Sequence, residues 1–328
     1  MKTRLTERLS IRHPIVCAPM ALVTGGRLAS AVSAAGGLGV VGGGYAGALG
    51  GEPDLGRELA LADGQPVGVG FITWALRQAP GALDLALAAR PTAIFLSFGD
   101  PMPFATKIRE AKVALICQVQ TLAHVARAVE VGADIIVAQG TEAGGHGATR
   151  STLPFVPEVA DFLAAHAPAT LLLAAGGIAD GRGLAAALML GADGVVMGSR
   201  FWSSAEALTP AGATDRAHRA SGDDTVRTRA IDLVRGVPWP DQYSFRVVKN
   251  QLTAAWADRE AEAARTPGCY AAEYQAARDR GDFDIAAVVA GEAVGLIRDR
   301  PPAGAIVARV VREAKARIAL WTRSGATR

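Results

Sequence analysis

Apolar and polar positions alternate in blocks along the first two hundred residues. Short, continuously apolar runs have the length of strands, and an uninterrupted apolar run is typical of a strand buried on both faces of a sheet. Ala-rich stretches with helical periodicity lie between the runs, the clearest at residues 122–131. The eight apolar runs cover residues 14–20, 38–44, 67–72, 93–99, 113–119, 134–140, 171–177 and 194–200.

This alternation of strands and helices predicts a parallel sheet. Eight units are enough to close a barrel, whereas five or six would favour an open doubly wound sheet. We therefore predict an α/β protein with a (β/α)8 TIM barrel. Almost every apolar run ends in glycine or a small polar residue. In a barrel those ends line the catalytic face, although glycine also simply ends strands and begins turns.

The alternation stops after Arg200. The next segment is polar and helical in pattern and carries most of the remaining Trp and Tyr residues. We predict a barrel over residues 1–202, a helical cap on the substrate side over residues 203–284, and a C-terminal part, residues 285–328. An amphipathic helix near residues 306–320 is expected to return to the barrel.

Composition narrows the class of protein. Half of the 328 residues are hydrophobic and the formal net charge is only +3, with Lys and Arg scattered. The absence of a basic stripe argues against nucleic-acid binding. No apolar segment is long enough to span a bilayer, and the N-terminus lacks a secretory signal, so we expect a cytoplasmic protein with no membrane association. The oligomeric state stays open.

The three cysteines, Cys17, Cys117 and Cys269, show no paired spacing. We expect reduced thiols, with the first two serving as small core residues. There is no HExxH, metal-spaced Cys/His pair, GxSxG or Walker motif. The sequence therefore predicts no metal site and no serine hydrolase.

Two glycine motifs follow the seventh and eighth runs, AAGGIADGRG at residues 174–183 and VMGSRF at residues 196–201. Glycines let backbone amides approach an anion, and a helix start adds favourable partial charge. The loops after the last two strands are the usual phosphate site of a barrel. The expected donors are the amides of Gly176, Gly177, Gly198 and Ser199, with ordinary glycine turns as the alternative.

A third glycine-rich loop, AQGTEAGGHGA at residues 138–148, carries His146 directly after the sixth run. Histidine is the side chain suited to proton abstraction near neutral pH, so we predict that His146 handles a proton; the alternative is a surface or structural histidine. Glu142 is either a second acid–base group or a solvated carboxylate. The other four histidines receive no role.

Two strand ends offer weaker candidates. Met20 ends the CAPM motif of the first run, and its exposed backbone is suited to meet a planar ring. Gln118 ends the fifth run and has an amide that can hydrogen-bond a ring carbonyl or nitrogen; a capped strand end is the alternative.

PIVCAPM, GTEAGGHG, AAGGIADGRG and VMGSRF, in this order, resemble the nitronate monooxygenase family, formerly called 2-nitropropane dioxygenases. The likeness covers about residues 14–201 and the IRDRPPAGAIV stretch near the end. Related FMN enzymes, including an enoyl-acyl-carrier-protein reductase and NADH:quinone reductases, share the EAGGH loop and the AAGGI motif.

The resemblance implies an FMN-bearing barrel in which His146 takes the α-proton of a neutral nitroalkane. The nitronate is then oxidised with flavin and O2 to a carbonyl compound and nitrite. The resemblance also places flavin contacts on Met20, Gln118, Gly140, Gly145, Gly177, Gly198 and Ser199.

This chain departs from the family pattern at Cys17, where many relatives have Gln, and at Gly70, where many have Asn. Two alternative functions stay open. One is an FMN-dependent NAD(P)H:quinone or enoyl-thioester reductase; the other, from a different class, is a flavin-free barrel that binds a phosphate ligand.

Overall fold

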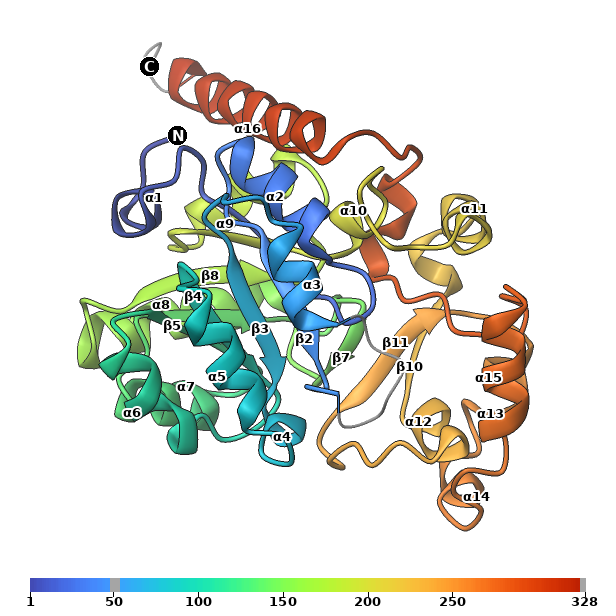
Figure 1. The fold of residues 1–328 in the computed structure, drawn as a ribbon. Helices are drawn as coiled ribbons and strands as arrows, with labels where there is room; N and C mark the ends of the chain where they lie inside the picture. The colour runs from blue at the N-terminus through green and yellow to red at the C-terminus, as the bar shows by residue number, and fades with distance from the viewer. Residues whose placement is uncertain (48–53, 325–328) are drawn as a thin grey trace.

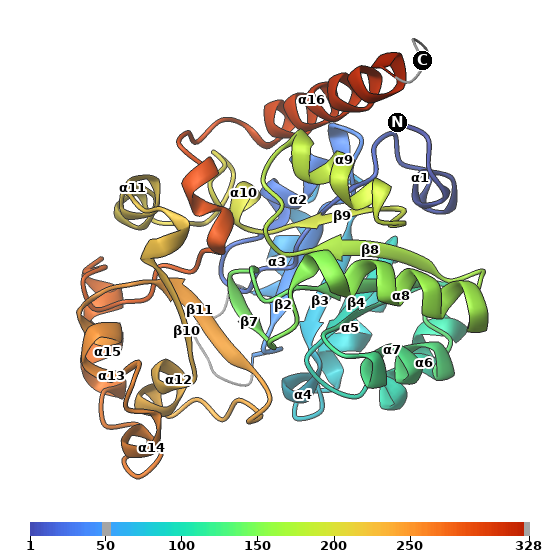
Figure 2. The ribbon, with the colours of Figure 1, turned by 180° about the vertical axis from the view of Figure 1, so that it is seen from behind.

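The computed structural model describes residues 1–47 and 54–324. Eight parallel strands form a sheet in the order β1-β9-β8-β6-β5-β4-β3-β2, and an isolated parallel bridge between Val16 and Leu38 connects its two edges. The sheet is therefore a closed barrel (Figures 1 and 2). Its strands are β1 (Ile15–Cys17), β2 (Val40–Gly44), β3 (Gly68–Ile72), β4 (Ala93–Ser97), β5 (Ala114–Val119), β6 (Ile135–Gln139), β8 (Leu171–Ala175) and β9 (Gly194–Met197).

Each of the eight predicted apolar runs contains one of these strands, so the prediction of a (β/α)8 barrel is confirmed. Helices follow the strands and cover the outside of the sheet. They are α2 (Gly26–Ala34), α3 (Leu55–Ala60), α4 (Thr73–Leu76), α5 (Gly81–Ala88), α6 (Met102–Glu110), α7 (Leu122–Glu130), α8 (Thr152–His166), α9 (Gly181–Met189) and α10 (Ser199–Trp202).

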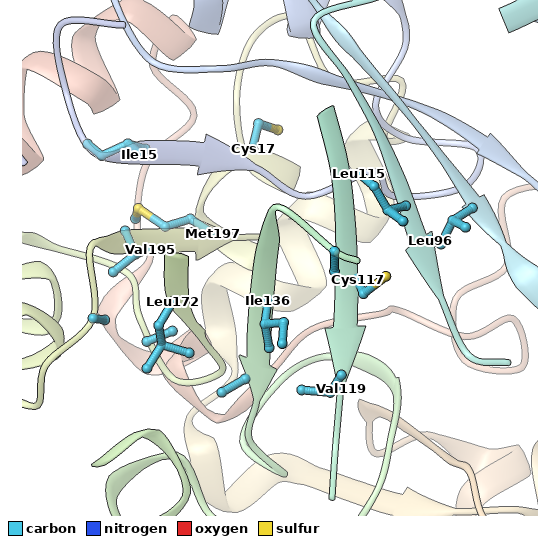
Figure 3. Packing of buried hydrophobic residues seen from close by; sticks show 14 of the residues in the cluster. Ile15, Cys17, Leu96, Leu115, Cys117, Val119, Ile136, Leu172, Val195 and Met197 are labelled. Carbon is cyan, nitrogen blue, oxygen red and sulfur yellow. The ribbon is translucent and has the colours of Figure 1, made fainter. Parts of the chain in front are cut away.

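The core has two layers because successive strand residues face opposite sides of the sheet. Val16, Ile116 and Val137 belong to a cluster made almost wholly of strand residues, which fills the barrel interior. Helix α1 (Arg4–Leu9) adds Leu5 and Leu9 to this cluster. The alternate strand residues pack outward against the helices, and ten of this second layer are labelled in Figure 3.

Cys17 and Cys117 both belong to the outer layer of the core. Burial raises the pKa of each thiol to about 12. Both are therefore small, unreactive core residues, as the sequence predicted, whereas Cys269 is exposed.

The C-terminal helix α16 (Ala303–Ser324) packs against α9 and α2 (Figure 1). The approach to α9 is close, because a Cβ atom on Gly181 would lie 2.3 Å from the backbone nitrogen of Ala314. Across the described residues, no helix combines the length and apolar character needed to cross a membrane.

The segment after the barrel contains more than helices. Strands β10 (Thr225–Thr228) and β11 (Ser244–Val248) pair antiparallel, and β11 pairs in turn with β7 (Gly145–Gly147), the strand that holds His146. The purely helical interpretation of residues 203–284 missed this small sheet. The helices of this part are α11 (Ala211–Arg219), α12 (Ala230–Arg235), α13 (Gln251–Trp256), α14 (Glu260–Ala263) and α15 (Ala271–Asp279), with 3-10 turns at Gly222–Asp224 and Glu292–Leu296.

Candidate active site

A cavity of about 400 Å³ opens at the carboxyl ends of the barrel strands, where the post-barrel segment covers them. Most of the predicted site residues come together in its wall, although they are spread over much of the sequence. The wall includes Met20, Gln118, Gly145, His146, Gly176, Gly177, Gly198 and Ser199.

Gly140 is the predicted site residue that the structure does not place on the cavity wall. A Cβ atom there would lie 1.9 Å from Oγ1 of Thr152 and 2.4 Å from the carboxylate of Glu142. Glycine at this position therefore makes room for the packing behind the wall.

Bare backbone lines the part of the cavity between β8 and β9. Gly176 and Gly177 have φ values of 103° and 71°, a region that side chains strongly disfavour. Within the described residues, the amides of Gly176, Gly177, Gly198 and Ser199 donate no hydrogen bond to the protein. All four predicted amide donors are thus free of protein acceptors among the described residues.

The start of α9 is not available for an anion, although the glycine motif indicated a helix start. Asp180 accepts hydrogen bonds from the amides of Arg182 and Gly183, and Glu313 of α16 accepts one from Gly181 at 3.0 Å. Because carboxylates already occupy this helix end, an anion must bind to the loop amides before it.

Backbone contacts fix the position of His146. Gln139, at the end of β6, donates from Nε2 to the carbonyl of His146 at 3.1 Å, and Gln120 donates to Oε1 of Gln139 at 2.9 Å. On the other side, His146 is the direct partner of Phe245 in the pairing of β7 with β11. The histidine is therefore held from the barrel and from the post-barrel sheet together.

The imidazole itself is buried, with 8% of its side chain exposed. Its Nε2 atom lies 2.8 Å from Oδ2 of Asp232 on α12. One face stacks on Trp239 with ring centroids 3.4 Å apart, and the other stacks on Phe245 at 4.4 Å. These three partners come from the post-barrel segment.

Burial lowers the pKa of His146 below the usual value for histidine, because it disfavours the charged imidazolium. The Asp232 carboxylate opposes this shift, while the nearby guanidinium groups of Arg235 and Arg227 add to it. The net direction favours a neutral imidazole near pH 7, the form that can accept a proton.

Two arginines, the partly buried Arg227 and the buried Arg246, hold the loop that leads to His146. Arg227 of β10 donates to the carbonyls of Thr141 and Ala143 at 3.0 and 2.7 Å, and Arg246 of β11 donates to Thr141 at 3.0 Å. Burial lowers the pKa of Arg227 to about 10, and the charge of Arg246 acts in the same direction. The cost of burying this charge is offset by its carbonyl acceptors.

Glu142 lies in the same loop and faces the cavity, but its carboxylate already has partners. It accepts hydrogen bonds from the backbone amide of Thr152 at 3.0 Å and from its hydroxyl at 2.7 Å. These contacts make Glu142 an anchor between the loop and the start of α8.

Aromatic rings gather at one side of the cavity, although only 5% of the chain is aromatic. Trp239 meets Tyr45, Trp74, Phe98 and Tyr243 edge to face, and its indole N–H donates to the Tyr45 hydroxyl at 3.0 Å. Phe98 holds a φ of 63°, an uncommon conformation for a bulky residue. Such packing gives His146 an apolar environment on this side of the cavity.

Sequence reasoning missed Asp232, Trp239 and Phe245 as site residues. The one available signal was the concentration of Trp and Tyr after the barrel, and it did not single out a residue. The other four histidines do not line the cavity.

The barrel, with its cavity and histidine at the carboxyl ends of the strands, defines a (β/α)8-barrel enzyme. A sequence profile described as "Nitronate monooxygenase" matches residues 2–72 and 71–313. The chain therefore belongs to the nitronate monooxygenase family and is a flavin oxidoreductase.

Individual proteins agree with this assignment. The chain is 36% identical to a nitronate monooxygenase of Neurospora crassa over 93% of this chain and 89% of the relative. Its structure is similar to FabK from Thermotoga maritima, with a TM-score of 0.82, 28% identity and 99% of both chains covered. It is also similar to a nitroalkane oxidase from Streptomyces ansochromogenes, with a TM-score of 0.76, 26% identity and 96% and 99% covered.

Proposed function

We propose that this protein oxidises alkyl nitronates and nitroalkanes with FMN and O2, giving a carbonyl compound and nitrite, with His146 as the general base. The observation that carries the proposal is a buried imidazole of lowered pKa in the wall of a barrel cavity that also presents free backbone amides. Family membership and the likeness to a nitroalkane oxidase support the same chemistry.

The residues present fit FMN. The amides of Gly177, Gly198 and Ser199 would hold its phosphate, since they lack acceptors in the described protein and the two glycines carry no side chain of their own. Met20 and Gln118 line the same cavity and are suited to contact the ring system. When bound, the flavin supplies the redox chemistry by which electrons pass from the substrate to O2.

His146 deals with the step that the protein itself must perform. A neutral nitroalkane has to lose a carbon-bound proton, and a neutral imidazole within reach accepts it. Aromatic rings stack on the imidazole and give it an apolar environment, which favours the neutral form that acts as a base. A nitronate has already lost this proton and does not need the base.

The test compares His146→Ala with the wild type on both substrate forms. We expect kcat/KM for the neutral nitroalkane to fall by about 10²–10⁴-fold, the usual contribution of a general base, and activity on preformed nitronate to fall much less. His124→Ala, on a helix outside the cavity, is the matched control and should change neither value. Equal losses on both substrates, with flavin still bound, would contradict the assignment of the base.

The cofactor and the competing reductase activity are tested with one purified sample. An absorbance spectrum and the mass of the extracted chromophore identify the flavin. Anaerobic addition of nitronate should bleach it, and NADH should bleach it slowly or not at all. Rapid bleaching by NADH without substrate would favour the reductase, and a colourless protein would favour the flavin-free barrel.

A further inference from the structure

A carboxylate that no sequence motif singled out lies against the proposed base. Asp232 and His146 are 86 positions apart in the chain, yet their side chains meet at 2.8 Å, between Oδ2 and Nε2. Only 5% and 8% of these side chains is exposed. Buried polar groups in proteins are generally hydrogen-bonded, and this contact gives each of the two side chains a partner. It therefore belongs to the structure of the site and joins the loop of His146 to α12.

The surroundings of the imidazole leave one nitrogen for chemistry. Trp239 and Phe245 cover the two ring faces, with interplanar angles of 8° and 12°. Asp232 occupies Nε2, whereas Nδ1 makes no hydrogen bond with any described residue. Because His146 also lines the cavity, a substrate proton can reach the imidazole only at Nδ1.

The partner on Nε2 determines where the proton of the neutral ring resides. An ionised carboxylate only accepts hydrogen bonds, so Nε2 must carry the hydrogen and Nδ1 the lone pair. A base needs its lone pair toward the substrate. The contact with Asp232 therefore selects the reactive one of the two tautomers.

We propose that Asp232 is a positioning residue, which holds His146 in the Nε2–H tautomer and stabilises the imidazolium that forms when Nδ1 takes the substrate proton. The bond that breaks is the C–H bond of the substrate, whose electron pair stays on the nitronate, and the bond that forms is Nδ1–H. This inference rests on the proposed role of His146, and Asp232 itself touches no substrate.

Asp232→Asn tests the proposal because the neighbouring guanidinium of Arg235 determines the orientation of the new amide group. Oδ1 of Asp232 has no hydrogen-bond partner among the described residues and lies 3.7 Å from Nη1 of Arg235. In the variant, the carbonyl oxygen of the new amide should turn toward this guanidinium and its NH2 group toward Nε2. That arrangement forces the imidazole proton onto Nδ1 and removes the lone pair from the cavity.

We expect Asp232→Asn to lower kcat for the neutral nitroalkane by about 10²-fold or more, with KM nearly unchanged and preformed nitronate much less affected. Charged groups that face His146 are Asp232 and Arg235 on α12 and Arg227 on β10. With the carboxylate gone, the acidic limb of the pH profile should move to lower pH.

The control is Asp241→Asn, the same chemical change at an 88% exposed side chain that pairs with Arg229. It should leave kcat and KM for the neutral nitroalkane unchanged.

Nitrogen-15 NMR of the histidine side chains reads the tautomer directly. The chain has five histidines, and the signals missing in His146→Ala identify the ring. The wild type should carry its proton on Nε2 and Asp232→Asn on Nδ1. A wild-type proton on Nδ1, or an unchanged tautomer with equal losses on both substrates, overturns the proposal. If the variant does not fold, the tautomer seen in the wild-type spectrum still tests the proposal for Asp232. Inactivity of the wild type on both substrates would instead refute the proposed function.

Discussion

At the scale of single residues, the site depends on one imidazole in an environment that keeps it neutral. Burial lowers the pKa of His146, and Asp232 offsets only part of this effect. A histidine in water titrates near pH 6.5, so the buried ring gives up its proton at a lower pH. The direction of this shift favours the neutral imidazole, the form that the proposed role of His146 requires.

This shift predicts the pH dependence of the enzyme. If the neutral imidazole of His146 is the base, the acidic limb of kcat/KM for the neutral nitroalkane should be centred below the ordinary histidine pKa of about 6.5. The measurement is the initial rate with freshly dissolved neutral nitroalkane over a range of pH. An acidic limb centred above the usual histidine pKa would show that Asp232, rather than burial, controls the ring.

At the scale of elements, the C-terminal helix is fitted to the barrel through one glycine. Gly181 begins α9, and α16 lies so close that any side chain there would meet its backbone. Glu313 of α16 also accepts the amide hydrogen of Gly181 at 3.0 Å. The contact ties the end of the chain to the helix that follows the proposed phosphate loop.

Gly181→Ala should therefore destabilise the protein by about 1–3 kcal/mol, the usual cost of forcing an extra methyl group into a packed contact. Gly304→Ala, on α16 itself, is the control, because its Cβ would meet only the Ala35 methyl at an ordinary 3.7 Å. Thermal unfolding of the two variants measures the difference. Equal melting temperatures would mean that α16 moves away at no cost.

At the scale of the whole molecule, the site belongs to two parts of the chain. The barrel supplies the glycine loops and His146, while the post-barrel segment supplies the partners of the imidazole. Arg227 and Arg246 join the two parts by donating to the loop carbonyls before His146. The position of His146 therefore depends on the small sheet of β10, β11 and β7.

Arg227→Met should weaken this connection, leaving only Arg246 as a donor to the loop carbonyls. It leaves the partly buried carbonyl of Ala143 without its donor, and an unpaired acceptor of this kind costs up to about 1–3 kcal/mol of folding free energy. Activity on the neutral nitroalkane should also fall while flavin stays bound. Arg229→Met, which breaks a pair with the exposed Asp241, should cost less than about 1 kcal/mol. Denaturant unfolding and turnover of both variants test this, and similar losses would argue against the connection.

The sequence by itself determined the barrel and much of the cavity wall. Strands buried on both faces must be continuously apolar, so the local sequence is enough to predict where they lie. The apolar run at residues 113–119, for example, contains β5. The carboxyl ends of parallel strands meet at one edge, so Gly177, Gly198 and His146 could be predicted to lie together.

Only the tertiary structure decided what surrounds the imidazole. Asp232 and Trp239 have no local pattern that distinguishes them from other acidic and aromatic residues of the segment. Their position follows from the pairing of β11 with β7, which sets Phe245 opposite His146 and brings α12 alongside. That pairing joins residues about a hundred positions apart. It cannot be predicted from the hydrophobic periodicity of either segment alone.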